Sequence, residues 1–184
     1  MARACALHTC SGVTTSGRAT ENGLPWILAV GVSADGIQAV ATVVRGLPTP
    51  FPGAVLIVLH RRVAGRWAAV LSRLAGRDVT EPADGDVLKP DQIYVAPGDR
   101  HLIVPDGRIR VEFSERVRFA RPSINVLFES VAHAYGPRVI GVLLSGYGSD
   151  GAAGLHAIAA DGIDLTLPLR EIGPAIGRLV SEDG

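Results

Sequence analysis

Two stretches decide the fold: Trp26-Ile-Leu-Ala-Val-Gly-Val32 and Ala54-Val-Leu-Ile-Val-Leu59. Both are short and apolar at every position, which is typical of strands covered on both faces. The segment from Ile37 to Val44 between them has apolar residues at helical spacing, and prolines follow it. A strand, a helix and a second buried strand predict a βαβ unit in a parallel sheet.

The rest of the chain continues this alternation. Three short, partly alternating runs around Ile93, His101 and Arg108 predict a β-hairpin at the edge of the main sheet. The other predicted elements are helices at 65–75, 122–135, 152–160 and 170–180 and strands at 139–144 and 163–167. We therefore expect an α/β fold, a three-layer, doubly wound domain with a mostly parallel sheet.

Composition limits the class of protein. The chain has 184 residues, of which 47% are apolar, and its 18 basic and 18 acidic side chains leave no net charge. Broad electrostatic binding of nucleic acid is therefore not expected. The sequence contains neither an apolar run of about 18 residues, as a membrane span requires, nor the core of a signal peptide. We expect a cytoplasmic monomer without membrane insertion.

The N-terminal segment differs from the rest of the chain. Residues 1–24 are rich in Ser, Thr, Ala and Gly and show no period, so they predict a flexible arm before a single domain at 25–184. Both cysteines, Cys5 and Cys10, lie in this arm, and the five histidines lack metal-ligand spacing. We expect no metal and no cofactor.

Three polar residues follow predicted strands. Ser33 ends the first, His60 ends the second, and Asp150 lies in a glycine-rich loop after the strand at 139–144. Ligands of parallel sheets bind beyond the carboxyl ends of the strands, so these side chains can converge there. A serine, a histidine and an aspartate together supply a nucleophile, a base and the group that orients the base.

Each of these residues also has a structural explanation. Ser33 and Asp150 could cap the helices that follow them, and His60 could be a hydrogen-bonded residue at a strand end. Asp35 could replace Asp150 as the acid, and His101 could line the cleft or lie in the hairpin. The spacing alone leaves these alternatives open. His133 and His156 lie on predicted helices, where surface or packing roles are more common.

A set of ordered motifs carries a resemblance to a known family. The motifs are Gly31-Val-Ser-Ala-Asp-Gly36, Val58-Leu-His60, Glu81-Pro-Ala-Asp-Gly-Asp-Val-Leu-Lys-Pro90, Ile93-Tyr-Val-Ala-Pro-Gly98, Arg100-His-Leu102, Arg121-Pro-Ser123 and Ser145-Gly-Tyr-Gly-Ser-Asp-Gly-Ala-Ala-Gly-Leu155. Over roughly 26–180 the chain resembles the catalytic domain of CheB, the chemoreceptor protein-glutamate methylesterase.

This resemblance implies a function and a set of site residues. It implies hydrolysis of glutamate γ-methyl esters on methyl-accepting chemotaxis receptors, with deamidation of certain receptor glutamines. The catalytic serine, histidine and aspartate of the family match Ser33, His60 and Asp150. The candidates for the oxyanion site and substrate contacts are Ala34, Gly36, Gly146, Tyr147 and Gly148.

The chain departs from the family pattern in several places. Ser33-Ala-Asp-Gly36 replaces Ser-Thr-Gly-Gly, Tyr147 replaces a methionine, and about thirty residues are missing after Gly162. The N-terminal segment is too short for the family's receiver domain, so phosphorylation control within the chain is not expected. A catalytically weak receptor-binding module and a general small-ester hydrolase therefore remain as alternatives.

Overall fold

The computed structural model describes residues 3–6, 24, 26–33, 35–60, 65–144, 150–158 and 163–182. The main sheet has seven strands, ordered β4 (Val79–Thr80), β5 (Ile93–Val95), β3 (Gly53–Leu59), β2 (Trp26–Val32), β8 (Val139–Leu144), β1 (Arg3–Ala6) and β9 (Ile163–Thr166). The five strands from β4 to β8 run parallel, and β1 is antiparallel to both of its neighbours. The carboxyl ends of β3, β2 and β8 therefore meet at one edge.

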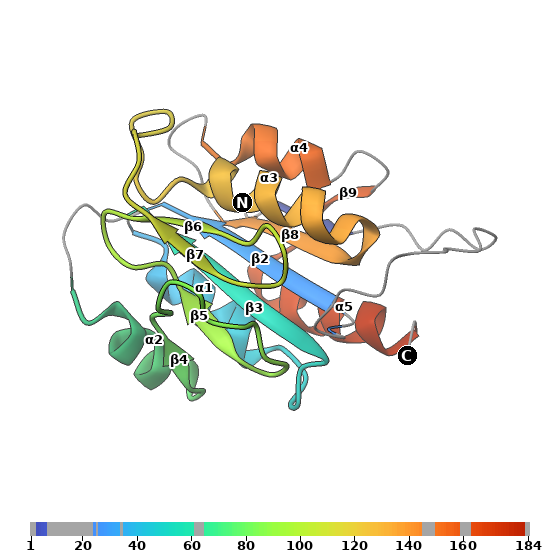
Figure 1. Ribbon diagram of the computed structural model, residues 1–184. Coiled ribbons are helices and arrows are strands. Elements are labelled where there is room, and N and C mark those ends of the chain that lie inside the picture. The colour runs from blue at the N-terminus through green and yellow to red at the C-terminus, as the bar shows by residue number, and fades with distance from the viewer. Residues whose placement is uncertain are drawn as a thin grey trace.

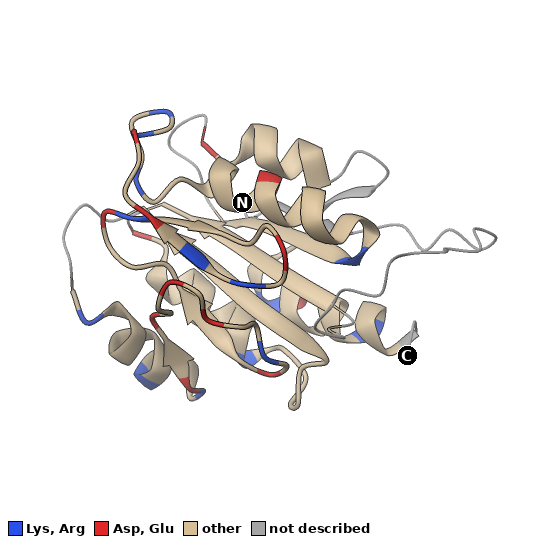
Figure 2. Cartoon of the chain, in the orientation of Figure 1, with Lys and Arg blue, Asp and Glu red and all other residues tan. Residues whose placement is uncertain are grey.

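Helices cover both faces of this sheet (Figure 1). One face carries α1 (Ile37–Arg45), α2 (Trp67–Ala75) and α5 (Leu169–Glu182), and the other carries α3 (Ile124–Tyr135) and α4 (Ala152–Ile158). Every residue of β2 and β3 is buried, and neither strand carries a charged side chain (Figure 2). The predicted three-layer α/β fold is confirmed.

The predicted hairpin is present as β6 (His101–Ile103) and β7 (Arg110–Glu112). It forms a separate two-stranded sheet and is not hydrogen-bonded to the edge of the main sheet. Leu102 and Ile109 pack in the core beneath α3, so apolar contact joins the hairpin to the domain. A short 3-10 helix, Gly136–Arg138, links α3 to β8.

The N-terminal segment differs from its prediction. Residues 1–24 were expected to form a flexible arm, but Arg3–Ala6 form β1, which pairs with β8 on one side and β9 on the other. The backbone hydrogen bonds of this strand fill the gap between β8 and β9, a long-range pairing that four residues of local sequence do not encode. Residues 7–23 lie outside the described part of the chain.

The C-terminal helix packs closely against α1. A Cβ atom on Gly173 would lie 2.6 Å from the backbone carbon of Gly46, so the absence of side chains allows the two helices to approach. None of the helices in the described ranges is long and apolar enough to cross a bilayer.

Candidate active site

Ser33 and His60 directly follow the ends of two adjacent strands. Val32 and Leu59, the last residues of β2 and β3, are partners in the parallel register. The N–H of His60 donates to the carbonyl oxygen of Val32 over 3.1 Å, which extends this pairing by one step. Since neighbouring strands lie about 5 Å apart, the register brings Ser33 and His60 side by side at the carboxyl edge.

The structure decides against Ser33 as the cap of the following helix. The N-cap residue of α1 is Gly36, which has no side chain that could cap the helix. The Ser33 carbonyl accepts a hydrogen bond from the N–H of Gly36 over 3.0 Å, which closes the turn between β2 and α1. Ser33 is therefore not the N-cap residue of α1, and its side chain is partly exposed.

Asp150 is the most extensively bonded polar group at this edge. Its Oδ2 accepts hydrogen bonds from Nε2 of His60 and the N–H of Ile124, both over 2.7 Å. Its Oδ1 accepts from the hydroxyl of Ser123 over 2.7 Å and from the N–H of Asn125 over 3.1 Å. The side chain is only 5% exposed, so protein donors replace water around the carboxylate.

The hydrogen bonds keep this buried carboxylate ionised. Burial would raise the pKa of Asp150, but the hydrogen bonds from His60, Ile124, Ser123 and Asn125 together lower it below its usual value. Two of these donors are the first backbone N–H groups of α3, where the helix dipole also favours an anion. Asp150 is thus an anion at neutral pH.

The ionised carboxylate fixes the tautomer of His60. A carboxylate only accepts hydrogen bonds, so Nε2 of His60 must carry the proton that it shares with Asp150. Nδ1 is then left as the lone-pair nitrogen of the neutral ring. The His60 side chain is 23% exposed, so it is open to a substrate while its other nitrogen is held in the interior.

Small residues let α3 approach the strand that carries Ser33. A Cβ atom on Gly31 would lie 2.3 Å from Cγ2 of Ile124, the residue whose N–H holds Asp150. Gly151 has a φ of +102°, and a Cβ atom there would lie 2.8 Å from Leu143. Gly31 and Gly151 therefore allow the close packing that places Asp150 beside His60.

Two further polar side chains, which were not among the residues predicted for the site, support Asp150. Ser123 is the N-cap of α3, and its hydroxyl accepts from the N–H of Val126 while it donates to Asp150. The amide oxygen of Asn125 accepts from the N–H groups of Gly151 and Gly154 over 2.9 and 2.8 Å, which fixes the turn after Asp150. A serine before an apolar helix is a recognisable N-cap signal in a sequence. Its hydrogen bond to Asp150, however, joins residues far apart in the chain and cannot be predicted from that local pattern.

His101 has a structural position in β6, one of the two alternatives considered for it. The ring is buried, and its Nδ1 accepts from the N–H of Ser123 over 3.2 Å. Its Nε2 donates to the carbonyl of Glu115 over 2.9 Å. His101 therefore holds the segment before α3 in place and does not line an open cleft.

The remaining candidates divide into four groups. Gly36 was a candidate oxyanion donor, but its single N–H donates to Ser33, which argues against that role. Asp35 is exposed, and the acid position beside His60 is filled by Asp150. His133 and His156 are exposed on their helices. The candidates that lie outside the described residues are Ala34, Gly146, Tyr147 and Gly148.

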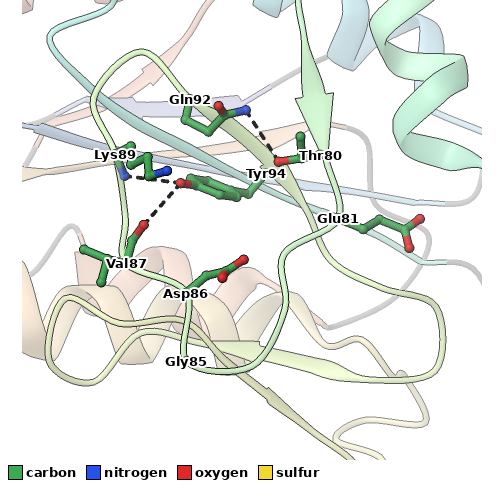
Figure 3. A pocket seen from close by; sticks show the side chains of 8 residues that line it. All are labelled: Thr80, Glu81, Gly85, Asp86, Val87, Lys89, Gln92 and Tyr94. Carbon is green, nitrogen blue, oxygen red and sulfur yellow. Dashed lines mark hydrogen bonds between the residues drawn. The ribbon is translucent and has the colours of Figure 1, made fainter.

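The structure also contains a pocket of about 510 Å³ beside β4 and β5 (Figure 3). Its lining includes Glu81 and Lys89, and the hydroxyl of Tyr94 bonds the backbone of residues 87 and 89 at its wall. Burial raises the pKa of Glu81. None of its eight lining residues is Ser33, His60 or Asp150, so the pocket is separate from that cluster. Within the described ranges, no group of three or more His, Cys, Asp and Glu side chains could hold a metal ion.

Comparison with known proteins identifies the family. The family model of the CheB methylesterase matches residues 28–167, which include β3, β8, all but the first two residues of β2, and the three residues Ser33, His60 and Asp150. The chain belongs to the CheB methylesterase family.

Relatives and a solved structure support this assignment. The chain is 41% identical over 138 residues to a protein-glutamate methylesterase/protein-glutamine glutaminase of Anaeromyxobacter dehalogenans, covering 72% of this chain and 39% of that protein. It is 33% identical to the protein of the same name from Moorella thermoacetica, covering 86% of this chain and 45% of that protein. The crystal structure of the Thermotoga maritima CheB methylesterase catalytic domain matches with a TM-score of 0.75 at 25% identity, covering 84% of this chain and 98% of that one.

Proposed function

We propose that this CheB family member hydrolyses glutamate γ-methyl esters on the cytoplasmic regions of methyl-accepting chemoreceptors, with Ser33, His60 and Asp150 as a catalytic triad. The observation that carries the proposal is the 2.7 Å hydrogen bond between Nε2 of His60 and the buried carboxylate of Asp150. It lies at the strand end next to Ser33. The names of the relatives supply the substrate class.

The chemistry follows from the tautomer of His60. The Ser33 Oγ attacks the ester carbonyl carbon while Nδ1 of His60 accepts the hydroxyl proton. The imidazolium that forms is stabilised by the Asp150 anion on its Nε2 side. Collapse of the tetrahedral intermediate breaks the bond to the methoxy oxygen, and His60 delivers its proton to the departing methanol.

Water completes the turnover. His60 takes a proton from a water molecule that attacks the glutamyl-serine ester, and collapse of the second intermediate returns the proton to Ser33. The products are a free glutamate side chain and methanol. We propose N–H groups of Ala34 and of the loop at 146–148 as oxyanion donors, each worth about 3 kcal/mol in related chemistry.

A glutamine side chain would follow the same course with ammonia as the leaving group. The second half of the relatives' printed name, protein-glutamine glutaminase, favours this as an additional activity. We further propose that residues 25–184 form the catalytic unit together with strand β1, that it acts as a monomer in the cytoplasm, and that it needs neither metal nor cofactor.

The direct test is methanol release from a methylated cytoplasmic fragment of a chemoreceptor. Wild-type protein should release methanol, and Ser33→Ala should lower the rate by at least about 10⁴-fold without changing the circular dichroism spectrum. The control is Ser130→Ala on α3, whose hydroxyl bonds only backbone groups of residues 104 and 127. Release that persists in Ser33→Ala would contradict the triad.

The same assay distinguishes the alternative function. A folded wild-type protein that binds the fragment but releases no methanol would be a catalytically weak receptor-binding module. Equal turnover of simple acyl esters, without preference for the receptor fragment, would instead indicate a general small-ester hydrolase.

A further inference from the structure

The most exposed large apolar side chain in the described part of the chain lies in the loop between β7 and α3. Phe119 is 89% exposed, and Phe113 in the same loop is 62% exposed. The other large apolar side chains found exposed there are Val70 and Val87, at 40% and 37%. Two exposed phenyl rings in one loop offer a large apolar surface for contact with another molecule.

The backbone holds Phe119 outward in a defined turn. Val117 and Ala120 exchange two backbone hydrogen bonds of 3.1 and 2.9 Å, so Arg118 and Phe119 form the tip of a two-residue hairpin. The φ angles of Arg118 and Phe119 are 48° and 65°, a region that bulky residues rarely adopt. Residues held in such conformations cluster at active sites and ligand-binding sites, which makes this turn a candidate for a functional role.

Further contacts hold the base of this turn rigid. The guanidinium of Arg121 donates to both carboxylate oxygens of Asp99 over 3.0 and 3.1 Å. It also stacks on the ring of Phe113, whose centroid lies 3.8 Å away. Arg100 lies 5.0 Å from the same centroid. The turn is therefore organised before any partner arrives, which lowers the entropy cost of binding.

The turn also lies close to the proposed catalytic residues. Phe119 precedes Ser123 by four residues, so their Cα atoms are at most about 14 Å apart. The hydroxyl of Ser123 donates to Asp150, which in turn bonds His60. An α-helix rises about 5.4 Å per turn, so three turns of a substrate helix are longer than the separation of Phe119 and Ser123. A helix that presents one side chain near Ser123 and Asp150 can therefore contact Phe119 with a residue about three turns away.

Charge favours an acidic partner at this turn. Residues 99–100 and 113–121 contain four arginines and two carboxylates. One of the arginines, Arg116, is 45% exposed at 3.6 Å from Asp99. Figure 2 shows basic residues on this loop, which projects beyond the layers of the domain in Figure 1. A helix that carries glutamates matches this charge.

We propose that the turn at 117–120, with Phe119 at its tip, is a docking element for an acidic, amphipathic helix of the protein substrate. An apolar side chain of that helix packs on the Phe119 ring, and its unmethylated glutamates face the arginines. The proposal rests on the proposed function, because it takes the glutamyl-ester protein as the occupant. The turn contacts substrate away from the scissile ester and so acts on binding.

The experiment compares two substrates with one set of variants. Phe119→Asn removes the ring but keeps a residue that tolerates positive φ, and Phe119→Tyr restores an aromatic ring at the same position. Val70→Asn, on α2 at the opposite face of the sheet, is the matched control for loss of an exposed apolar side chain. The substrates are the methylated receptor fragment and the small ester N-acetyl-glutamate γ-methyl ester N′-methylamide.

We expect Phe119→Asn to raise KM for the receptor fragment about tenfold while kcat/KM for the small ester stays within twofold of wild type. Phe119→Tyr and Val70→Asn should match wild type on both substrates. Raising the salt concentration should raise KM for the fragment more than for the small ester.

Each other outcome overturns the docking role. Unchanged KM for the fragment in Phe119→Asn shows that the ring is not used. An equal loss on both substrates shows that the turn acts on the catalytic residues through Ser123. If wild-type protein cleaves neither ester, the proposed function itself fails, and the docking role fails with it. If wild-type protein cleaves both esters, the proposed function stands, and the variants then test the docking role alone.

Discussion

The buried polar groups at the two ends of helix α3 differ in whether they have hydrogen-bond partners. At the N-terminal end, the Ser123 hydroxyl and the first backbone N–H groups all bond to Asp150. At the C-terminal end, the hydroxyl of Tyr135 is buried and has no hydrogen-bond partner among the residues that the structure describes. Burial, with a smaller contribution from Asp106, raises the pKa of Tyr135 to about 12.

The polar groups at the N-terminal end of α3 position Asp150 in the site. The Tyr135 hydroxyl at the C-terminal end is buried only because its aromatic ring packs in the core. A buried group without a partner forfeits its hydrogen bonds to water, whereas a satisfied network fixes side chains in one arrangement. Substitutions at the N-terminal end of α3 should therefore affect catalysis strongly, and substitutions at its C-terminal end should not.

Among the substitutions that test this comparison, Asp150→Asn should have the largest effect. The neutral amide cannot stabilise the His60 imidazolium, and its NH₂ group would face a backbone N–H donor where an oxygen now accepts. We expect kcat for methanol release to fall by about 10³–10⁴-fold and the free energy of unfolding to fall by about 1–3 kcal/mol, measured by urea denaturation.

The pH dependence of stability supplies the control for this variant. The folded-state pKa of Asp150 is lowered, so its contribution to stability is complete above the unfolded-state pKa of about 4 and is lost as the pH falls through the lower folded-state value. The stability gap between wild type and Asp150→Asn should be fully present at about pH 5 and shrink as the pH falls below about 4. A gap that does not shrink below about pH 4 would contradict an ionised Asp150.

A smaller effect is expected for Ser123→Ala, which removes one of four donors to Asp150 and the cap of Val126. We expect about a tenfold loss of kcat with KM unchanged and a loss of about 1 kcal/mol in stability. Ser130→Ala on the same helix should cost similar stability but leave kcat intact. If Ser123→Ala and Ser130→Ala had equal effects on kcat, Ser123 would contribute only to the stability of the fold and not to catalysis.

The smallest effect is expected for Tyr135→Phe, which removes only the unpartnered hydroxyl. Stability should change by less than about 1 kcal/mol, in the direction of stabilisation, and kcat should stay at the wild-type value. Thermal denaturation and the methanol assay measure the two quantities. Destabilisation by more than that amount would show that the hydroxyl has a partner in solution.

The elements of the fold could be predicted from the sequence where apolar residues form a continuous run or recur at helical spacing. Strands β2, β3 and β8 are apolar throughout because both faces are covered, and their helices show clear spacing, so the layers and the strand ends at Ser33 and His60 could be predicted. The pairing of Asp150 with His60 could be proposed because the carboxyl ends of parallel strands share an edge.

Long-range contacts could not be predicted from local patterns. Strand β1 pairs with residues far along the chain. The hydrogen bonds that Ser123 and Asn125 donate to Asp150 also join segments more than twenty residues apart. The separation of β6 and β7 from the main sheet is likewise set by packing under α3. These features depend on tertiary geometry, which no periodicity encodes.

The central claim is that His60, held by Asp150, activates Ser33. The most direct measurement is mass spectrometry of the protein after treatment with a fluorophosphonate, which adds to a serine only when that serine is activated as a nucleophile. We predict a single adduct on Ser33 in the wild type and loss of that adduct in both His60→Ala and Asp150→Asn. An adduct on another serine, or one on Ser33 that persists in both variants, would contradict the account.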